Sequence, residues 1–178
     1  MLPLFQRVGD ELGKANCLAS LGDIALRRED HLEAGHRYAE ALPLYRRVGN
    51  VLGEANCIKN IGDIAERGAD HAGARVRYQE AQLLYLRLGD AVGEATCIAC
   101  LGRVAAATGD KETARSQGHT ALAMLGPVHA TRHITIVHED LAAVTTGSER
   151  AAHVAAAKAG WREMGLEDQA ARLERRFG

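Results

Sequence analysis

A phosphate-binding motif is the first chemistry that the sequence could encode. The segment GDELGKAN, Gly9–Asn16, contains the paired glycines and the lysine that such a loop uses. A phosphate loop needs about four residues between its glycines, and Ser or Thr after the lysine to hold magnesium. Here the spacing is one residue shorter and Ala15 follows Lys14. Later copies of the segment carry Glu54 and Glu94 in place of the lysine. We therefore predict no nucleotide site.

The cysteines could serve as metal ligands or as a redox pair. Cys97 and Cys100 form a C-x-x-C motif, but zinc needs four ligands and the sequence has no second pair at suitable spacing. Cys17, Cys57 and Cys97 recur at a constant interval. In a helical repeat these positions would be more than about 8 Å apart, beyond the reach of a disulfide. We expect reduced, buried thiols.

Histidines are the third group that could do chemistry, and they are enriched late in the chain. They are His119, His129, His133, His138 and His153. His129 and His133 could share a helix face with His138 nearby, but Ala142 stands where an H-E-x-x-H motif needs its second ligand. Solvated helix positions explain them better than a surface metal site. We predict no metal ligand, no catalytic residue and no cofactor.

The composition narrows the class of protein further. The 178 residues have a net charge of −1 with both signs interspersed, which gives no basic face for nucleic acid. Aromatic residues make up 4% and there are 3 prolines, so helix is favoured over an all-β fold. Apolar runs are too short for a membrane span, and no leader sequence is recognisable. We expect a cytoplasmic protein with neither nucleic-acid nor membrane partners.

The elements that would position these side chains repeat along the chain. Residues 2–41 and 42–81 are identical at more than half of their positions, 82–121 is a more divergent copy, and the sequence after 127 is degenerate. A period in this range is typical of solenoids. In each copy a glycine suited to a helix end precedes a capping residue, as at Gly49 and Asn50. Two stretches with helical apolar spacing lie between these signals.

Small residues and tyrosines predict how the two helices of a copy pair. In the second copy Ile58 and Ile61 belong to an apolar stripe on the first helix, while Tyr78 and Tyr85 lie on the second helix at helical spacing. Gly62 costs about 1 kcal/mol in helix propensity but lets another helix approach closely. We expect each hairpin to pack through small residues with a tyrosine filling the remaining gap.

This order of residues resembles the tetratricopeptide repeat. It is carried by Leu21, Gly22, Ala34, Tyr38 and Ala41 in the first copy and by Ile61, Gly62, Ala74, Tyr78 and Ala81 in the second. In the third copy Gly118 replaces the tyrosine. The long period is similar to that of the sensor or scaffold arrays of bacterial multidomain regulators. The resemblance implies an all-α fold, a right-handed superhelical solenoid of antiparallel helix hairpins with a C-terminal capping helix.

The recurring helix-end and capping signals predict one array over 1–178. Its parts are a partial repeat helix at 1–9, repeats at 10–49, 50–89 and 90–127, a degenerate fourth repeat at 128–165 and a capping helix at 166–178. The cap prediction depends on an amphipathic face formed by Leu166, Ala170, Leu173 and Phe177. Because 1–9 matches the end of a second helix, the chain is expected to be an excised piece of a larger protein or to have an open N-terminal edge.

The resemblance also implies a binding groove lined by the first helices of the repeats. The residues expected to line it are Asn16, Asp23, Arg27, Asn56, Lys59, Asn60, Asp63, Arg67 and Arg103. An asparagine amide can both donate to and accept from a peptide backbone, which makes Asn16 and Asn56 candidate contacts. The alternative is that Asp23 with Arg27, and Asp63 with Arg67, only stabilise their own helices as i,i+4 pairs.

The predicted function is that of a non-enzymatic protein–protein interaction module. It would bind a peptide or helix of a partner protein in the concave groove, as the sensor or scaffold part of a larger cytoplasmic regulator. The alternative is a structural self-association module. Leu2, Phe5 and Val8 at an open N-terminal edge could dock on a second copy, or hairpins could be exchanged between copies.

Overall fold

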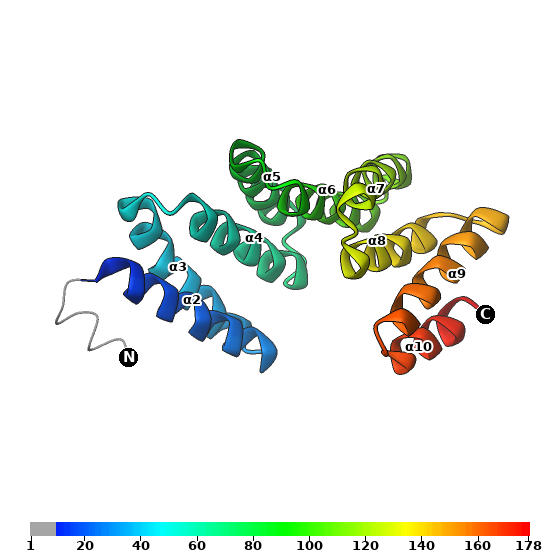
Figure 1. Ribbon diagram of the computed structural model, residues 1–178, viewed down its shortest axis with the longest axis horizontal. Helices are drawn as coiled ribbons and strands as arrows, with labels where there is room; N and C mark the ends of the chain where they lie inside the picture. Colours follow the sequence, from blue (N-terminus) through cyan, green and yellow to red (C-terminus); the bar gives the residue numbers. More distant parts are fainter. Residues whose placement is uncertain (1–9) are drawn as a thin grey trace. The chain divides into compact units, whose positions relative to one another are not determined.

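A computed structural model describes residues 10–178, and every regular element in this part of the chain is a helix (Figure 1). The elements are α2 (Glu11–Arg27), α3 (His31–Val48), α4 (Val51–Arg67), α5 (His71–Leu88), α6 (Ala91–Ala107), α7 (Lys111–Leu125), η1 (Gly126–Val128), α8 (Thr131–Val144), α9 (Gly147–Glu163) and α10 (Glu167–Phe177). Within residues 10–178, no helix is both long enough and apolar enough to span a lipid bilayer.

Consecutive helices pack as hairpins within two compact units (Figure 1). In the first unit, which ends at Asp90, α2 packs on α3, α3 on α4, and α4 on α5. In the second unit, Ala91–Gly178, α6 packs on α7, α7 on α8, α8 on α9, and α9 on α10. The predicted all-α fold of paired helices with a final helix at the C-terminus is confirmed.

Part of the domain prediction stays open. Nothing in the two units tests the predicted repeat boundaries, and the single array over 1–178 stays a prediction. The partial repeat helix predicted at 1–9, with Leu2, Phe5 and Val8, lies outside the described residues. The self-association alternative that depends on these three side chains is therefore also untested.

The helix ends follow the capping signals of the sequence. Gly49 ends α3 in the left-handed region at φ 70°, a conformation that favours glycine. The next residue, Asn50, caps α4, and its side chain accepts a hydrogen bond of 2.8 Å from the Gly53 amide. Asp30 caps α3 in the same way. Because these capping residues recur with the repeat, the helices begin and end at regular intervals along the chain.

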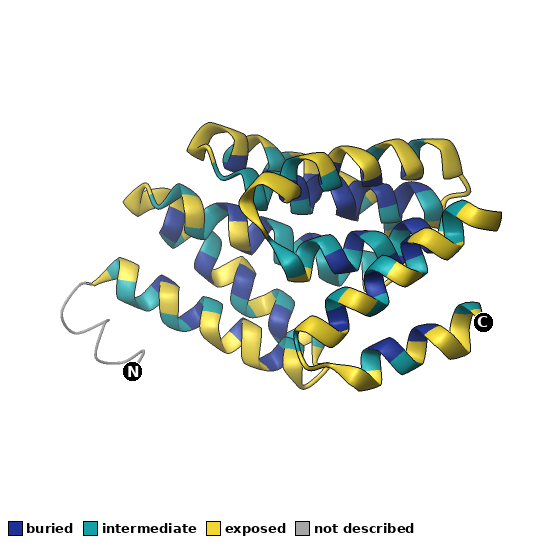
Figure 2. Cartoon of the chain, turned by 45° about the vertical axis from the view of Figure 1, so that its right-hand side comes forward, coloured by how far each residue is buried: buried dark blue, intermediate teal, exposed yellow. Residues whose placement is uncertain are grey.

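Buried tyrosines fill the contact between the helices of a hairpin. Tyr38 and Tyr78 are fully buried, and in each hairpin the buried residues lie where its two helices face each other (Figure 2). A Cβ on Gly62 would lie 2.8 Å from Cε1 of Tyr78, so the glycine is needed for the ring to pack there. Gly22 and Tyr38 repeat the arrangement at 2.7 Å. The close approach predicted at Gly62 is made by this tyrosine ring.

The last helix buries the face that its sequence predicts, with one difference. Ala170 and Leu173 are fully buried against Trp161, and Phe177 packs at the edge of the same cluster. Leu166 is 39% exposed, because it lies at the turn that precedes α10.

The four cysteines are thiols, of which Cys17 is half-buried and the others are buried.

Candidate functional site

Polar side chains of α2 and α4 line a cavity of about 270 Å³ in the first unit. We call this surface the asparagine face and define it as Asn16, Ser20, Asp23, Asn56 and Asn60. The rings of Tyr38 and Tyr45, from α3, also line the cavity. Because α2 and α4 occupy equivalent positions in successive hairpins, the sequence repeat places similar side chains on both helices.

Tyrosine hydroxyls fix the two asparagines that begin the face. Tyr45 donates a hydrogen bond of 2.8 Å to Oδ1 of Asn16, and Tyr85 donates one of 2.6 Å to Oδ1 of Asn56. In both cases the residues are 29 positions apart. The amide oxygens are therefore used, while neither Nδ2 group donates to another residue within 10–178. Each asparagine thus presents an oriented N–H donor.

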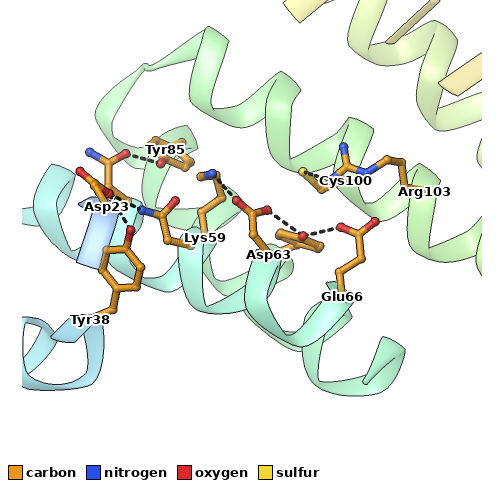
Figure 3. A network of polar contacts seen from close by, with 11 residues as sticks. Asp23, Tyr38, Lys59, Asp63, Glu66, Tyr85, Cys100 and Arg103 are labelled. Atoms are coloured by element: carbon orange, nitrogen blue, oxygen red, sulfur yellow. Dashed lines mark hydrogen bonds and ion pairs between the residues drawn. The ribbon is translucent and has the colours of Figure 1, made fainter. Parts of the chain in front are cut away.

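Asp23 lies between the two helices of the face (Figure 3). Its Oδ1 accepts a hydrogen bond of 2.5 Å from the Tyr38 hydroxyl, and Nδ2 of Asn60 is 3.5 Å from the same oxygen. Asp23 forms no ion pair with any described residue. Its negative charge is thus held at the cavity by two neutral donors.

Asp63, the counterpart of Asp23 in α4, has a different environment (Figure 3). Nζ of Lys59 donates to Oδ2 of Asp63 at 2.7 Å, and the Tyr78 hydroxyl lies 2.8 Å from Oδ1 and 2.6 Å from Oε2 of Glu66. Lys59 and Asp63 therefore neutralise each other, although both were predicted to contact a ligand.

The sequence analysis offered i,i+4 pairs of Asp23 with Arg27 and of Asp63 with Arg67 as an alternative, and neither pair is formed. Asp63 pairs with Lys59, one turn before it, rather than with Arg67, and Asp23 bonds to Tyr38 rather than to Arg27. The arginine side chains are exposed near the ends of α2 and α4 and form no ion pair within residues 10–178.

The two tyrosines and the cysteine around the cavity favour their neutral forms. Burial, and next the hydrogen bond to Asp23, raises the pKa of Tyr38. Burial is also the main reason that the pKa of Tyr45 rises to about 12 and that of Cys57 to about 12. At neutral pH the phenols therefore remain hydrogen-bond donors and the thiol remains protonated. This chemistry suits binding rather than nucleophilic attack.

Arg103 belongs to the second unit and lines a different cavity, of about 140 Å³. That cavity lies beside Gly102 and Gly118, where the third copy lacks the tyrosine of the other two. The Arg103 guanidinium is 3.6 Å from Oδ2 of Asp140 and donates to Sγ of Cys100 at 3.3 Å. Arg103 and Asp140 are 37 positions apart, as are Asp23 and Asn60. The contact between these equivalent positions is therefore kept later in the chain, but there it joins two charged side chains.

Four of the nine predicted groove residues meet at the asparagine face: Asn16, Asp23, Asn56 and Asn60. The sequence analysis assigned Tyr38 to helix packing, did not consider Tyr45, and missed the bonds of both residues to the site. The signal was present as a recurring separation, because Tyr38–Asp23 and Tyr78–Asp63 are both 15 positions apart.

The comparisons with known proteins identify a repeat family and a fold. The family model of the tetratricopeptide repeat matches residues 14–82, which contain the whole asparagine face. The comparison with curated protein sequences gave no match.

Several solved structures share the fold. The apo form of RapI has a TM-score of 0.84 at 11% identity, covering 96% of this chain and 64% of that one. The signal-transduction ATPase PH0952 from Pyrococcus horikoshii, which has a tetratricopeptide-repeat sensor, has a TM-score of 0.76 at 16% identity, covering 99% of this chain and 28% of that one. BtubC from P. vanneervenii has a TM-score of 0.61 at 13% identity, covering 99% of this chain and 85% of that one.

The chain spans less than two thirds of the length of RapI and of PH0952. Tetratricopeptide repeats generally act as non-enzymatic interaction modules, so the fold suggests a role in protein–protein interaction or as a scaffold. Residues 14–82 therefore belong to the tetratricopeptide-repeat family, within a chain whose paired helices have the fold of tetratricopeptide-repeat proteins.

Proposed function

We propose that the chain binds an extended peptide segment of a partner protein along the asparagine face. It would do so as the sensing or scaffolding part of a larger cytoplasmic protein. The larger context is supported by the fact that PH0952, a multidomain ATPase, contains a similar array as its sensor and is covered for only 28% of its length.

The observation that carries this proposal is the orientation of the asparagine amides. Because Tyr45 and Tyr85 occupy the oxygens of Asn16 and Asn56, the amide nitrogens remain to donate to a ligand. A peptide backbone offers carbonyl acceptors at regular intervals, whatever its side chains. Two oriented donors at equivalent positions of successive repeats therefore suit an extended chain. Fixing them by core tyrosines also limits the conformational entropy lost on binding.

The charges around the face indicate the composition of the ligand. Asp23 holds a negative charge at the cavity, whereas Arg27 and Arg67 hold exposed positive charges near the ends of α2 and α4. A basic or N–H-rich group would lie near Asp23 and an acidic group near the arginines. A peptide of mixed charge fits this pattern better than a polyanion.

The decisive experiment changes the donors without removing the tyrosine contacts. A random-peptide display selection on the wild-type protein supplies a peptide, and fluorescence anisotropy measures its affinity. In the double variant Asn16→Asp and Asn56→Asp, each side chain keeps an oxygen for its tyrosine but loses the N–H donors. We expect the peptide to bind at least tenfold more weakly, while helicity and thermal stability remain those of the wild type.

The matched control adds the same charge away from the face. Gln79 is exposed on α5 and Gln82 is half-buried there, and changing both to glutamate should leave peptide affinity within twofold. If selection yields no peptide, or if the asparagine variant binds the peptide as tightly as the wild type does, the asparagine face is not the binding surface.

A further inference from the structure

We propose that His119, Glu149 and His153 form a binding site for a divalent transition-metal ion of the zinc type. The site lies in the second unit and uses no residue of the asparagine face, so it does not depend on the proposed peptide binding. It differs from the sequence analysis, which considered His129, His133 and His138 and predicted no metal ligand.

The three side chains converge from two helices. Glu149 and His153 are one turn apart on α9 and so lie on the same face of that helix, and His119 comes from α7. One ligand atom from each residue lies within 4.8 Å of the other two. Nε2 of His119 is 3.6 Å from Oε1 of Glu149. Small rotations of the exposed His119 and the half-buried Glu149 would bring these atoms to coordination distance.

An unpaired buried nitrogen independently indicates a ligand. His153 is only 9% exposed, and its Nε2 has no hydrogen-bond partner anywhere in residues 10–178. A buried polar atom without a partner destabilises the folded state, so such atoms are rare unless something else satisfies them. A metal ion bound to this nitrogen would satisfy it.

His138, on α8, acts as a positioning residue for His153. The Nδ1 atoms of the two rings are 3.0 Å apart, so one of them donates to the other. When His153 is the donor, its Nε2 carries a lone pair, which is the form that binds metal.

The donor set suits zinc, but one neighbouring cation opposes it. Two imidazoles and one carboxylate leave a fourth position for water, a combination that zinc accepts in proteins. Nη2 of Arg115 donates to both oxygens of Glu149, at 2.9 and 3.0 Å. A carboxylate has about four lone-pair sites and can serve both partners, yet the arginine charge must weaken the site. Removing this charge should therefore strengthen metal binding.

Calorimetric titration of the full chain with ZnCl₂ tests the site. We expect one zinc ion per chain, at least tenfold weaker binding by His119→Ala and by Glu149→Gln, and tighter binding by Arg115→Ala. His129→Ala is the matched control, because His129 is exposed and lies outside the cluster, and it should bind zinc as the wild type does.

A second readout separates this site from the cysteines and from misfolding. His153→Ala changes a buried residue, so its result counts only if circular dichroism shows wild-type helicity, whereas His119 is exposed and its variant should fold. With Co²⁺ as the probe, nitrogen and oxygen ligands give d–d bands without a thiolate charge-transfer band. The proposal is wrong if zinc does not bind, if His119→Ala and Glu149→Gln bind it like the wild type, or if a thiolate band appears.

Discussion

Each tyrosine that packs between the helices of a hairpin also orients a polar side chain of the first helix. The ring of Tyr78 lies on Gly62, and its hydroxyl reaches Asp63, the residue that follows the glycine. Tyr38 has the same relation to Gly22 and Asp23. The positions of the site carboxylates are therefore set by core packing. A substitution in the core should also change the positions of these carboxylates.

Adding a methyl group at Gly62 tests this close packing. In Gly62→Ala the new Cβ would lie 2.8 Å from the fully buried ring of Tyr78. We expect the free energy of unfolding to fall by about 1–3 kcal/mol, despite the better helix propensity of alanine. Urea denaturation followed by circular dichroism measures this change.

Gly102→Ala is the matched control, because the third copy has Gly118 in place of the tyrosine. Its Cβ would be 3.3 Å from the Ala114 carbonyl oxygen and 3.4 Å from Cβ of Gln117, so no ring has to move. A smaller loss is expected here. If Gly102→Ala lost as much unfolding free energy as Gly62→Ala or more, the role of Gly62 would not be to make room for the tyrosine ring.

At the scale of the helices, the sequence predicted the pairing well because the signals are local. The left-handed glycine at Gly49 and the cap at Asn50 are encoded in adjacent residues and recur with the period. The bonds between Tyr45 and Asn16 and between His138 and His153 could not be predicted in the same way. They depend on how two helices meet, which helical periodicity within one element does not specify.

The final helix offers a test at the same scale. Trp161 is the only tryptophan and is 6% exposed, covered in part by Ala170 and Leu173 of α10. Its indole N–H donates to Glu139, whose Oε2 also accepts a hydrogen bond of 2.7 Å from Arg172 of α10. Removing α10 would expose an apolar face and leave a buried carboxylate without its cation.

We therefore expect truncation after Gly165 to lower the melting temperature and to shift tryptophan emission to the red. Leu173→Ala should act in the same direction with a smaller effect, of about 2–5 kcal/mol in unfolding free energy. Leu166→Ala is the matched control, because Leu166 is 39% exposed, and it should change neither readout appreciably. Unchanged emission from the truncated chain would show that α10 does not cover Trp161.

At the scale of the whole molecule, each unit contains its own buried clusters. In the first unit Tyr38 and Tyr45 pack with the small residues of α2 and α3 and with Cys57 of α4. In the second unit Leu125 and Leu141 are the largest fully buried members of one cluster, and Trp161 is the largest member of another. Repeat proteins are stabilised by contacts within and between neighbouring repeats, so a stretch that retains complete hairpins retains most of its stabilising contacts.

This arrangement predicts that the chain can be divided after Asp90. Fragments 1–90 and 91–178 each keep whole hairpins, so both should show helical circular dichroism and cooperative thermal unfolding. Dividing after Ala69 instead separates α4 from α5 and removes Tyr78 from the surface of Gly62, so the fragment 1–69 should lose helicity well beyond its share of residues. If 1–90 is unfolded alone, or if 1–69 is as helical per residue as 1–90, complete hairpins are not the stable unit of this chain.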